Sequence, residues 1–147
     1  MNLELYNIRA STSLMEFEFI SLGKKGEIIK VVQYSPTGIP NTYNLGFGDK
    51  DIKAGKVSDS VISDNGDGQK VLVTVAGTVI KFIENHPNSE VIAVGVSQSR
   101  TRLYQIGISN NLQEIAKSFH IYGFAHGKWH TFEKGKNYDA FLIRKKE

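Results

Sequence analysis

The chain has 147 residues, of which 40% are apolar and 22% charged, and it contains no cysteine. A chain of this length buries about 70% of its unfolded surface as one domain and needs no disulfide or metal to fold. The lack of cysteine excludes disulfides, thiolate metal sites and a cysteine nucleophile. The formal charge of +3 permits an anionic partner without requiring one. We therefore expect a single domain over residues 1–147, without a cofactor or a metal.

No segment predicts export or membrane insertion. Met1–Tyr6 lacks the basic start and the apolar core of a secretory signal. The longest apolar stretch, Val71–Ile83, is interrupted by polar residues and a glycine, so it is too short and too polar to span a bilayer. We expect a cytoplasmic protein with no membrane association.

The first third of the chain predicts β-structure. Glu16–Ile20 alternates between polar and apolar residues, Gly23–Gly26 is typical of a turn, and Glu27–Tyr34 is a β-branched return strand, so a hairpin is expected. Ser35–Asn41 contains two prolines and a glycine and predicts a loop. Tyr43–Gly48 predicts another strand, whose two glycines indicate a bulge or a close backbone approach.

The middle of the chain predicts a helix over Val71–Ile83, where apolar residues form a broad face. Asp64–Gly68 supplies turn and capping residues before this helix, and Asn85–Asn88 ends it. The width of the apolar face predicts a central helix that packs on a sheet. Ser58–Ile62 is expected to be a further short element before it.

Glu90–Val96 predicts a buried strand, and Ser99–Ile108 fits either a helix or a strand. We favour the helix, because Ser97 or Ser99 is suited to cap it and no polar–apolar alternation precedes Leu103.

The remaining elements complete the expected order β-β-β-α-β-α-α-β-β-β. A second short helix is predicted over Leu112–Ser118, followed by a hairpin of Phe119–Ala125 and Lys128–Phe132 around a His-Gly turn, and by a last strand at Tyr138–Arg144. This order predicts an α+β fold, in which a mostly antiparallel sheet carries a long central helix and one or two shorter helices on one face.

The segment from Ser97 to Tyr104 gathers the densest polar chemistry in the sequence. A helix beginning there would present unpaired backbone N–H groups, the hydroxyls of Ser97 and Ser99, and the guanidinium groups of Arg100 and Arg102, which together suit an anion. Tyr104 would stack on a base or donate its hydroxyl. The competing interpretation is structural: a serine caps the helix, the arginines pair with acids, and Tyr104 belongs to the core.

Lys70, at the start of the first helix, is a further candidate for an anion site. The turn before it invites a calcium interpretation, which fails because Thr74 stands where a bidentate glutamate is needed. His120 or His130 could serve as a general base, whereas the turn expected at Gly127 prevents His126 and His130 from forming a helical metal pair.

Aromatic residues are frequent in the C-terminal third. They are interleaved with basic residues, which indicates either a stacking platform for single-stranded nucleic acid or the aromatic core of a sheet. The core is the interpretation we favour. The residues are Tyr122, Phe124, Trp129, Phe132, Tyr138 and Phe141.

Four segments spread over the chain form a combined pattern. They are Tyr43–Asp49, Asn65–Asp67 leading into Lys70–Leu72, Thr101–Tyr104 and Asn137–Leu142. Together they resemble a family of small, uncharacterised bacterial proteins, a domain of unknown function. The resemblance implies a single domain and supplies no activity and no catalytic residues.

The leading functional hypothesis is a protein that binds an anionic ligand, RNA or a nucleotide, through Ser97, Ser99, Arg100 and Arg102 with help from Tyr104 and Lys70. One alternative is a protein-interaction module, such as one member of a toxin–antitoxin-like bacterial pair with a protein partner. The other is a metal-independent ribonuclease that uses His120 or His130 as its base.

Overall fold

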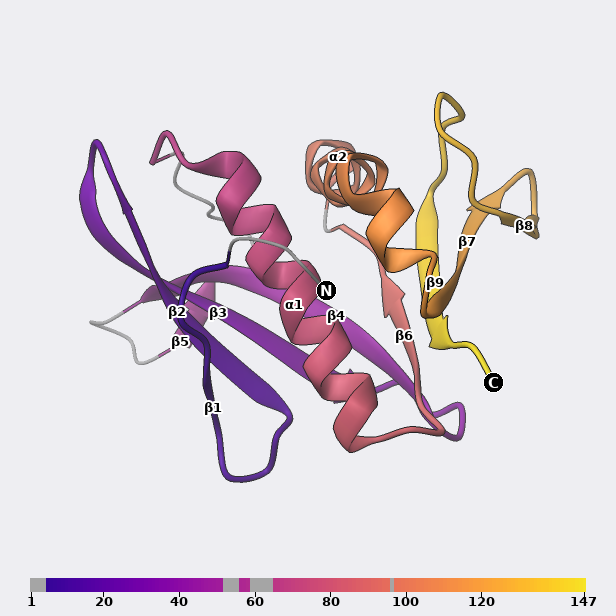
Figure 1. The fold of residues 1–147 in the computed structure, drawn as a ribbon, viewed down its shortest axis with the longest axis horizontal. Helices are drawn as coiled ribbons and strands as arrows, with labels where there is room; N and C mark the ends of the chain where they lie inside the picture. Colours follow the sequence, from indigo (N-terminus) through magenta and orange to yellow (C-terminus); the bar gives the residue numbers. More distant parts are fainter. Residues whose placement is uncertain (1–4, 52–55, 59–64, 96) are drawn as a thin grey trace.

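The computed structural model describes residues 5–51, 56–58, 65–95 and 97–147. Strands and helices follow one another in an α+β order, which confirms the fold class expected from the sequence (Figure 1). The elements are β1 (Arg9–Ala10), β2 (Glu16–Gly23), β3 (Gly26–Pro36), β4 (Thr42–Asp51), β5 (Lys56–Ser58), α1 (Gly68–Asn85), β6 (Glu90–Ala93), α2 (Gln98–Ile115), β7 (Phe119–Ala125), β8 (Lys128–Thr131) and β9 (Ala140–Lys145).

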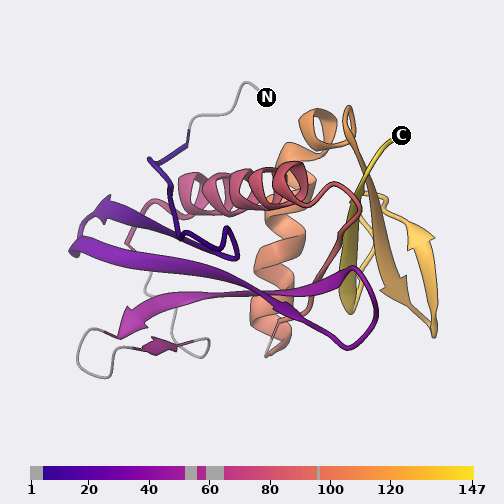
Figure 2. The same cartoon turned by 90° about the horizontal axis from the view of Figure 1, so that it is seen from below.

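The described strands form one twisted sheet in the order β1-β2-β3-β4-β6-β9-β7-β8, and β5 pairs with the far end of β4 (Figure 2). β4 and β6 run parallel, with Thr42–Leu45 opposite Glu90–Ala93. The other pairs among the described strands are antiparallel, so the expected mostly antiparallel sheet is confirmed. The parallel pair needs a crossover connection, and the chain makes it through α1.

Both hairpins predicted from local turn signals are confirmed. β2 and β3 pair without interruption from Glu16–Gln33 to Gly23–Gly26. β7 and β8 meet at His126 and Gly127, whose φ angles of 53° and 75° suit a two-residue turn between twisted strands. Of the bulge or close backbone approach expected at the two glycines of β4, the bulge is wrong, because the pairing with β3 stays in register through both.

Within the described residues there are two helices of 18 residues each, whereas a long helix with one or two shorter ones was expected. The helical interpretation of Ser99–Ile108 is confirmed, but the separate helix at Leu112–Ser118 is wrong, since α2 continues through Asn110 to Ile115. The side-chain amide of Asn111 donates to the Gly107 carbonyl one turn earlier, so this asparagine is accommodated inside the helix.

Several strand ends differ from the expected ones. β3 extends to Pro36, because Ser35 and Pro36 still pair with β4. β6 ends at Ala93 and not at Val96, as was expected. Val96 itself lies outside the described residues. β9 begins two residues later than expected, because Tyr138 is held against α2 before the strand starts. Apart from Ser58, which ends β5, the element expected at Ser58–Ile62 also lies outside the described residues.

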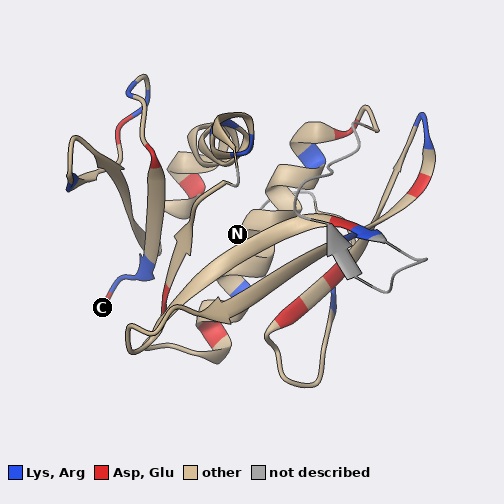
Figure 3. Cartoon of the chain, turned by 180° about the vertical axis from the view of Figure 1, so that it is seen from behind, with Lys and Arg blue, Asp and Glu red and all other residues tan. Residues whose placement is uncertain are grey.

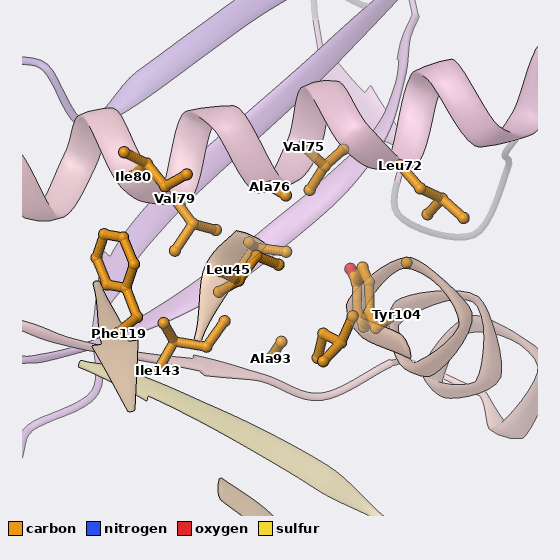
Figure 4. A pocket seen from close by; sticks show the side chains of 13 residues that line it. Leu45, Leu72, Val75, Ala76, Val79, Ile80, Ala93, Tyr104, Phe119 and Ile143 are labelled. Carbon is orange, nitrogen blue, oxygen red and sulfur yellow. The ribbon is translucent and has the colours of Figure 1, made fainter. Parts of the chain in front are cut away.

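The hydrophobic core lies between the sheet and the two helices. Side chains from α1, α2 and four central strands line a small apolar cavity of about 50 Å³, which Figure 4 shows in close view. The helices approach closely at Gly107, where a Cβ atom would lie 3.2 Å from that of Leu72. Neither helix is long and apolar enough to cross a membrane, for the residues that the structure describes.

A buried asparagine joins the first hairpin to the start of α1. Asn65 accepts a hydrogen bond from the Lys25 amide at 2.6 Å and donates to the Gly26 carbonyl at 2.9 Å and to the Ser21 hydroxyl at 3.1 Å. The Asp67 carboxylate beside it accepts from the Ser21 hydroxyl, at 2.6 Å. The turn considered for calcium is thus occupied by structural hydrogen bonds.

Candidate functional site

The junction between β6 and α2 is held by a compact set of hydrogen bonds. Ser97 is the N-cap of α2, and its Oγ accepts from the Arg100 amide at 3.2 Å. Thr101 ties the helix back to the strand, because its Oγ1 accepts from the Gly95 amide at 3.0 Å. The amides of Gln98 and Ser99 have no hydrogen-bond partner within the described part of the chain, so they are available to an incoming acceptor.

Arg100 and Arg102 lie in different environments. Arg100 is 6% exposed, and its guanidinium donates to the Phe47 carbonyl of β4. That carbonyl belongs to the interval of β4 between the residues that pair with β6 and those that pair with β5. Arg100 therefore supplies a hydrogen-bond donor to a carbonyl on the part of the β4 edge that no described strand pairs with.

Arg102 is exposed and forms no ion pair with any described residue. It lines an open groove of about 670 Å³ at the start of α2, together with Ser97 and Ser99. A groove of this size falls in the usual range for small-molecule sites. Three of the residues singled out in the sequence are thus brought together in one solvent-accessible place.

The other three candidates lie outside the groove lining. Arg100 is held beneath it by Phe47, and Tyr104 is buried and lines the apolar cavity instead. Lys70 belongs to the first turn of α1, where its Nζ lies 4.4 Å from the centre of the Tyr6 ring. Residues two positions apart on a helix point to different sides, which is why the two arginines separate.

The opposite wall of the groove is the loop before β9, which the sequence analysis did not include. Asn137, Tyr138 and Asp139 line it. Gln105 of α2 fixes this loop, since its Nε2 donates to the Lys136 carbonyl at 2.6 Å and its Oε1 accepts from the Tyr138 amide at 3.4 Å. The groove therefore presents both a cation, Arg102, and a carboxylate, Asp139.

Charge pairing also orders the loop itself. Lys136 Nζ lies 2.5 Å from a Glu133 carboxylate oxygen, and this contact lowers the pKa of the Glu133 carboxyl and raises the pKa of the Lys136 amine. The Glu133 amide donates to the Tyr138 hydroxyl at 3.0 Å, which closes the loop on itself.

The histidines do not join Arg102. His130 lines a neighbouring groove that shares Asn137, Tyr138 and Asp139 with the first but does not include Arg102, and its Nε2 lies 3.2 Å from the Ala125 carbonyl oxygen. His120 lies beside the C-terminal Arg144. No group of three or more metal-ligating side chains occurs among the described residues. The ribonuclease hypothesis therefore gains no geometric support.

Sequence reasoning also missed a buried ion pair between neighbouring strands. Lys30 Nζ of β3 lies 2.5 Å from Asp49 Oδ1 of β4, and the lysine side chain is 1% exposed. Lys30 shares its face with Val32 and Tyr34, so strand alternation was the signal that would have placed it in the core.

The fold and groove define a small α+β protein with an open polar site at a strand-to-helix junction. A family model matches residues 2–146, and the chain belongs to this family, the family of unknown function DUF6934. No curated protein and no solved structure matches the chain.

Proposed function

We propose that the chain is a cytoplasmic protein that binds a phosphate-bearing ligand, RNA or a nucleotide, in the groove at the start of α2. The observation that carries the proposal is the exposed Arg102, which has no ion-pair partner among the described residues and lines the groove beside Ser97 and Ser99.

The groove suits a phosphate for three physical reasons. The open amides of Gln98 and Ser99 point out of a helix start that carries about half a positive charge. The serine hydroxyls add neutral donors, and Arg102 adds a planar cation that can donate hydrogen bonds to two phosphate oxygens at once. Arg100 contributes indirectly, because it anchors the helix start to β4.

Asp139 favours a ligand that carries more than phosphate. A carboxylate in the groove repels a bare anion and accepts hydrogen bonds from hydroxyl or amino groups. A nucleotide or an RNA chain presents phosphate oxygens together with sugar hydroxyls, so it satisfies both walls of the groove. This combination favours RNA or a nucleotide over inorganic phosphate.

Binding of a labelled oligouridylate and of a nucleoside triphosphate, measured over a series of salt concentrations, tests the proposal. Arg102→Ala is expected to weaken binding about tenfold and to reduce the slope of log affinity against log salt by about 1. Arg9→Ala removes an equally exposed arginine on β1 and is the matched control. Equal affinity of the Arg102 variant and the wild type throughout the series would exclude the groove as the phosphate site.

A protein partner is the second candidate, and two exposed apolar side chains of β2 favour it. Beyond its short pairing with β1, β2 presents Ile20 and Leu22, which are 39% and 56% exposed. The Leu22 amide and carbonyl already bond the Tyr6 hydroxyl, so a partner would dock on these side chains rather than pair with the strand. Ile20→Lys with Leu22→Lys would abolish recovery of a stoichiometric partner in affinity purification, whereas recovery unchanged by these substitutions would argue against this surface.

A further inference from the structure

The C-terminal half of the sheet carries a row of aromatic side chains on the face opposite the helices. In β7, Phe119, Ile121 and Ala125 are buried on the helix side. Strand alternation places His120, Tyr122 and Phe124 on the other side, where no described helix lies (Figure 2). Trp129 of β8 extends this row, since it pairs with Phe124. We call these four residues, His120, Tyr122, Phe124 and Trp129, the aromatic row.

The rings of the row lie close together in two pairs. The Phe124 and Trp129 rings are 5.1 Å apart in an edge-to-face arrangement, and the His120 and Tyr122 rings are 6.2 Å apart. Trp129 is 43% exposed, and Tyr122 and Phe124 are partly exposed. A core interpretation does not explain these rings, because they face away from the core.

The remaining aromatic residues of this region behave differently. Phe132, Tyr138 and Phe141 are buried and contact one another within the core. The structure therefore divides the C-terminal aromatic residues into a core set and a surface set. The surface set is the one that this face of the sheet presents to a ligand.

Positive charge gathers around the aromatic row. Residues 117–147 hold seven of the 18 basic residues but only three of the 15 acidic ones. Arg144 of β9 lies 5.2 Å from the centre of the Tyr122 ring, and its Nη2 donates to the Tyr122 hydroxyl at 2.9 Å. Figure 3, viewed from behind, shows basic segments at the end of β9 and at the turn before β8. An anionic partner complements this charge, whereas a purely apolar one does not.

The aromatic row also reaches the end of the sheet at which the groove opens. Ala140, at the start of β9, pairs with Phe124, and the next residue of β9 pairs with the last residue of β6. β6 leads directly into Val94, which is 45% exposed and lines the groove. A single extended ligand can therefore pass from the groove onto the row.

We infer that the aromatic row stacks the bases of single-stranded RNA. This inference deepens the proposed function, on which it rests for the class of ligand. Aromatic rings stack on any unpaired base and need no particular sequence, and alternate side chains along a strand stand about 6.6 Å apart, which suits unstacked bases. Arg144 supplies a cation beside the rings for the backbone, and its Nη1 lies 3.7 Å from Glu90 Oε1, an exposed pair that a phosphate would compete with. Bases in a duplex are already stacked on each other, so the surface selects single strands.

Trp129 provides the direct test, because it is the only tryptophan in the chain. Titration of the wild-type protein with oligouridylate is expected to quench the fluorescence of Trp129, whereas an abasic ribose-phosphate oligomer of the same length is expected to bind without quenching. Fluorescence that stays unchanged while the oligouridylate saturates the protein overturns the inference.

Variants measured by fluorescence anisotropy of labelled oligomers give the second readout. Trp129→Ala is expected to weaken oligouridylate binding roughly 5- to 150-fold and to leave binding of the abasic oligomer unchanged. Trp129→Phe keeps a stacking ring and is expected to restore most of the affinity. Ile39→Ala, at an exposed apolar residue of the loop between β3 and β4, is the matched control.

The two proposals fail separately. If Trp129→Ala binds oligouridylate like the wild type while Arg102→Ala does not, the aromatic row is excluded and the groove stands. If Trp129→Ala weakens binding and Arg102→Ala does not, the groove is excluded and the row stands. Capture of a protein on this face, lost in Trp129→Ala and unaffected by oligouridylate, overturns the inference in favour of a protein partner.

Discussion

Replacing Arg100 by methionine is expected to destabilise the fold, although both arginines of α2 look equivalent in the sequence. Methionine keeps the apolar stem and removes the guanidinium that donates to the Phe47 carbonyl. A hydrogen bond from a charged group contributes about 1.5–3 kcal/mol, and a buried carbonyl left unpaired costs about 1–3 kcal/mol. Because these terms describe the same contact from two sides, we expect a loss of about 3 kcal/mol. For a domain of this size, that loss lowers the melting temperature by roughly 6–12 °C.

Urea denaturation followed by far-UV circular dichroism measures the loss. Arg102→Met is the control, since its exposed side chain forms no described ion pair, and it is expected to stay within about 0.5 kcal/mol of the wild type. If the two variants unfold at the same urea concentration, the assignment of Arg100 as an anchor between α2 and β4 is wrong.

Three further predictions concern the junctions of the fold. Asn65→Ala removes the hydrogen bonds of a buried amide to Ser21, Lys25 and Gly26 and should cost about 2–4 kcal/mol in urea unfolding, whereas Asn44→Ala, at an exposed asparagine, should cost almost nothing. Gly95→Ala places a Cβ 2.3 Å from the Thr101 amide nitrogen, so it should displace the start of α2 and lower both the melting temperature and the affinity for oligouridylate; unchanged values would contradict the close packing. Burial raises the pKa of Tyr34 and, with a hydrogen bond to a carboxylate, raises the pKa of Tyr6. The folded protein therefore keeps protons that the unfolded chain releases near pH 10. The contribution of these tyrosines to the free energy of unfolding should be complete below pH 10 and fall above it. Substituting both tyrosines by phenylalanine should remove part of this fall, as measured by urea denaturation at a series of pH values.

The sequence predicted correctly those elements that depend only on neighbouring residues. The His126-Gly127 turn and the broad apolar face of α1 depend on neighbouring residues, and both are found where the sequence places them. The break expected near Asn110 was wrong because asparagine usually favours turns, and the sequence did not show that Asn111 bonds within the helix.

Burial at the site depends on contacts between distant residues. Arg100 is anchored to Phe47, which lies 53 positions earlier, and Gln105 holds a loop more than 30 positions later. Helical spacing separates the two arginines, but it does not say which one meets another strand. Three of the residues chosen from the sequence, Ser97, Ser99 and Arg102, share one groove, and the sequence could not show that the loop before β9 lines it too.

The four residues of β6 connect the two halves of the sheet. Both of its partners, β4 and β9, are distant in the sequence, and pairing between distant segments forms slowly. Until β6 is inserted, β4 and β9 each present an unpaired edge that a neighbouring chain can occupy. Refolding yield should therefore fall as the protein concentration rises, because pairing between chains competes with the insertion of this one short strand.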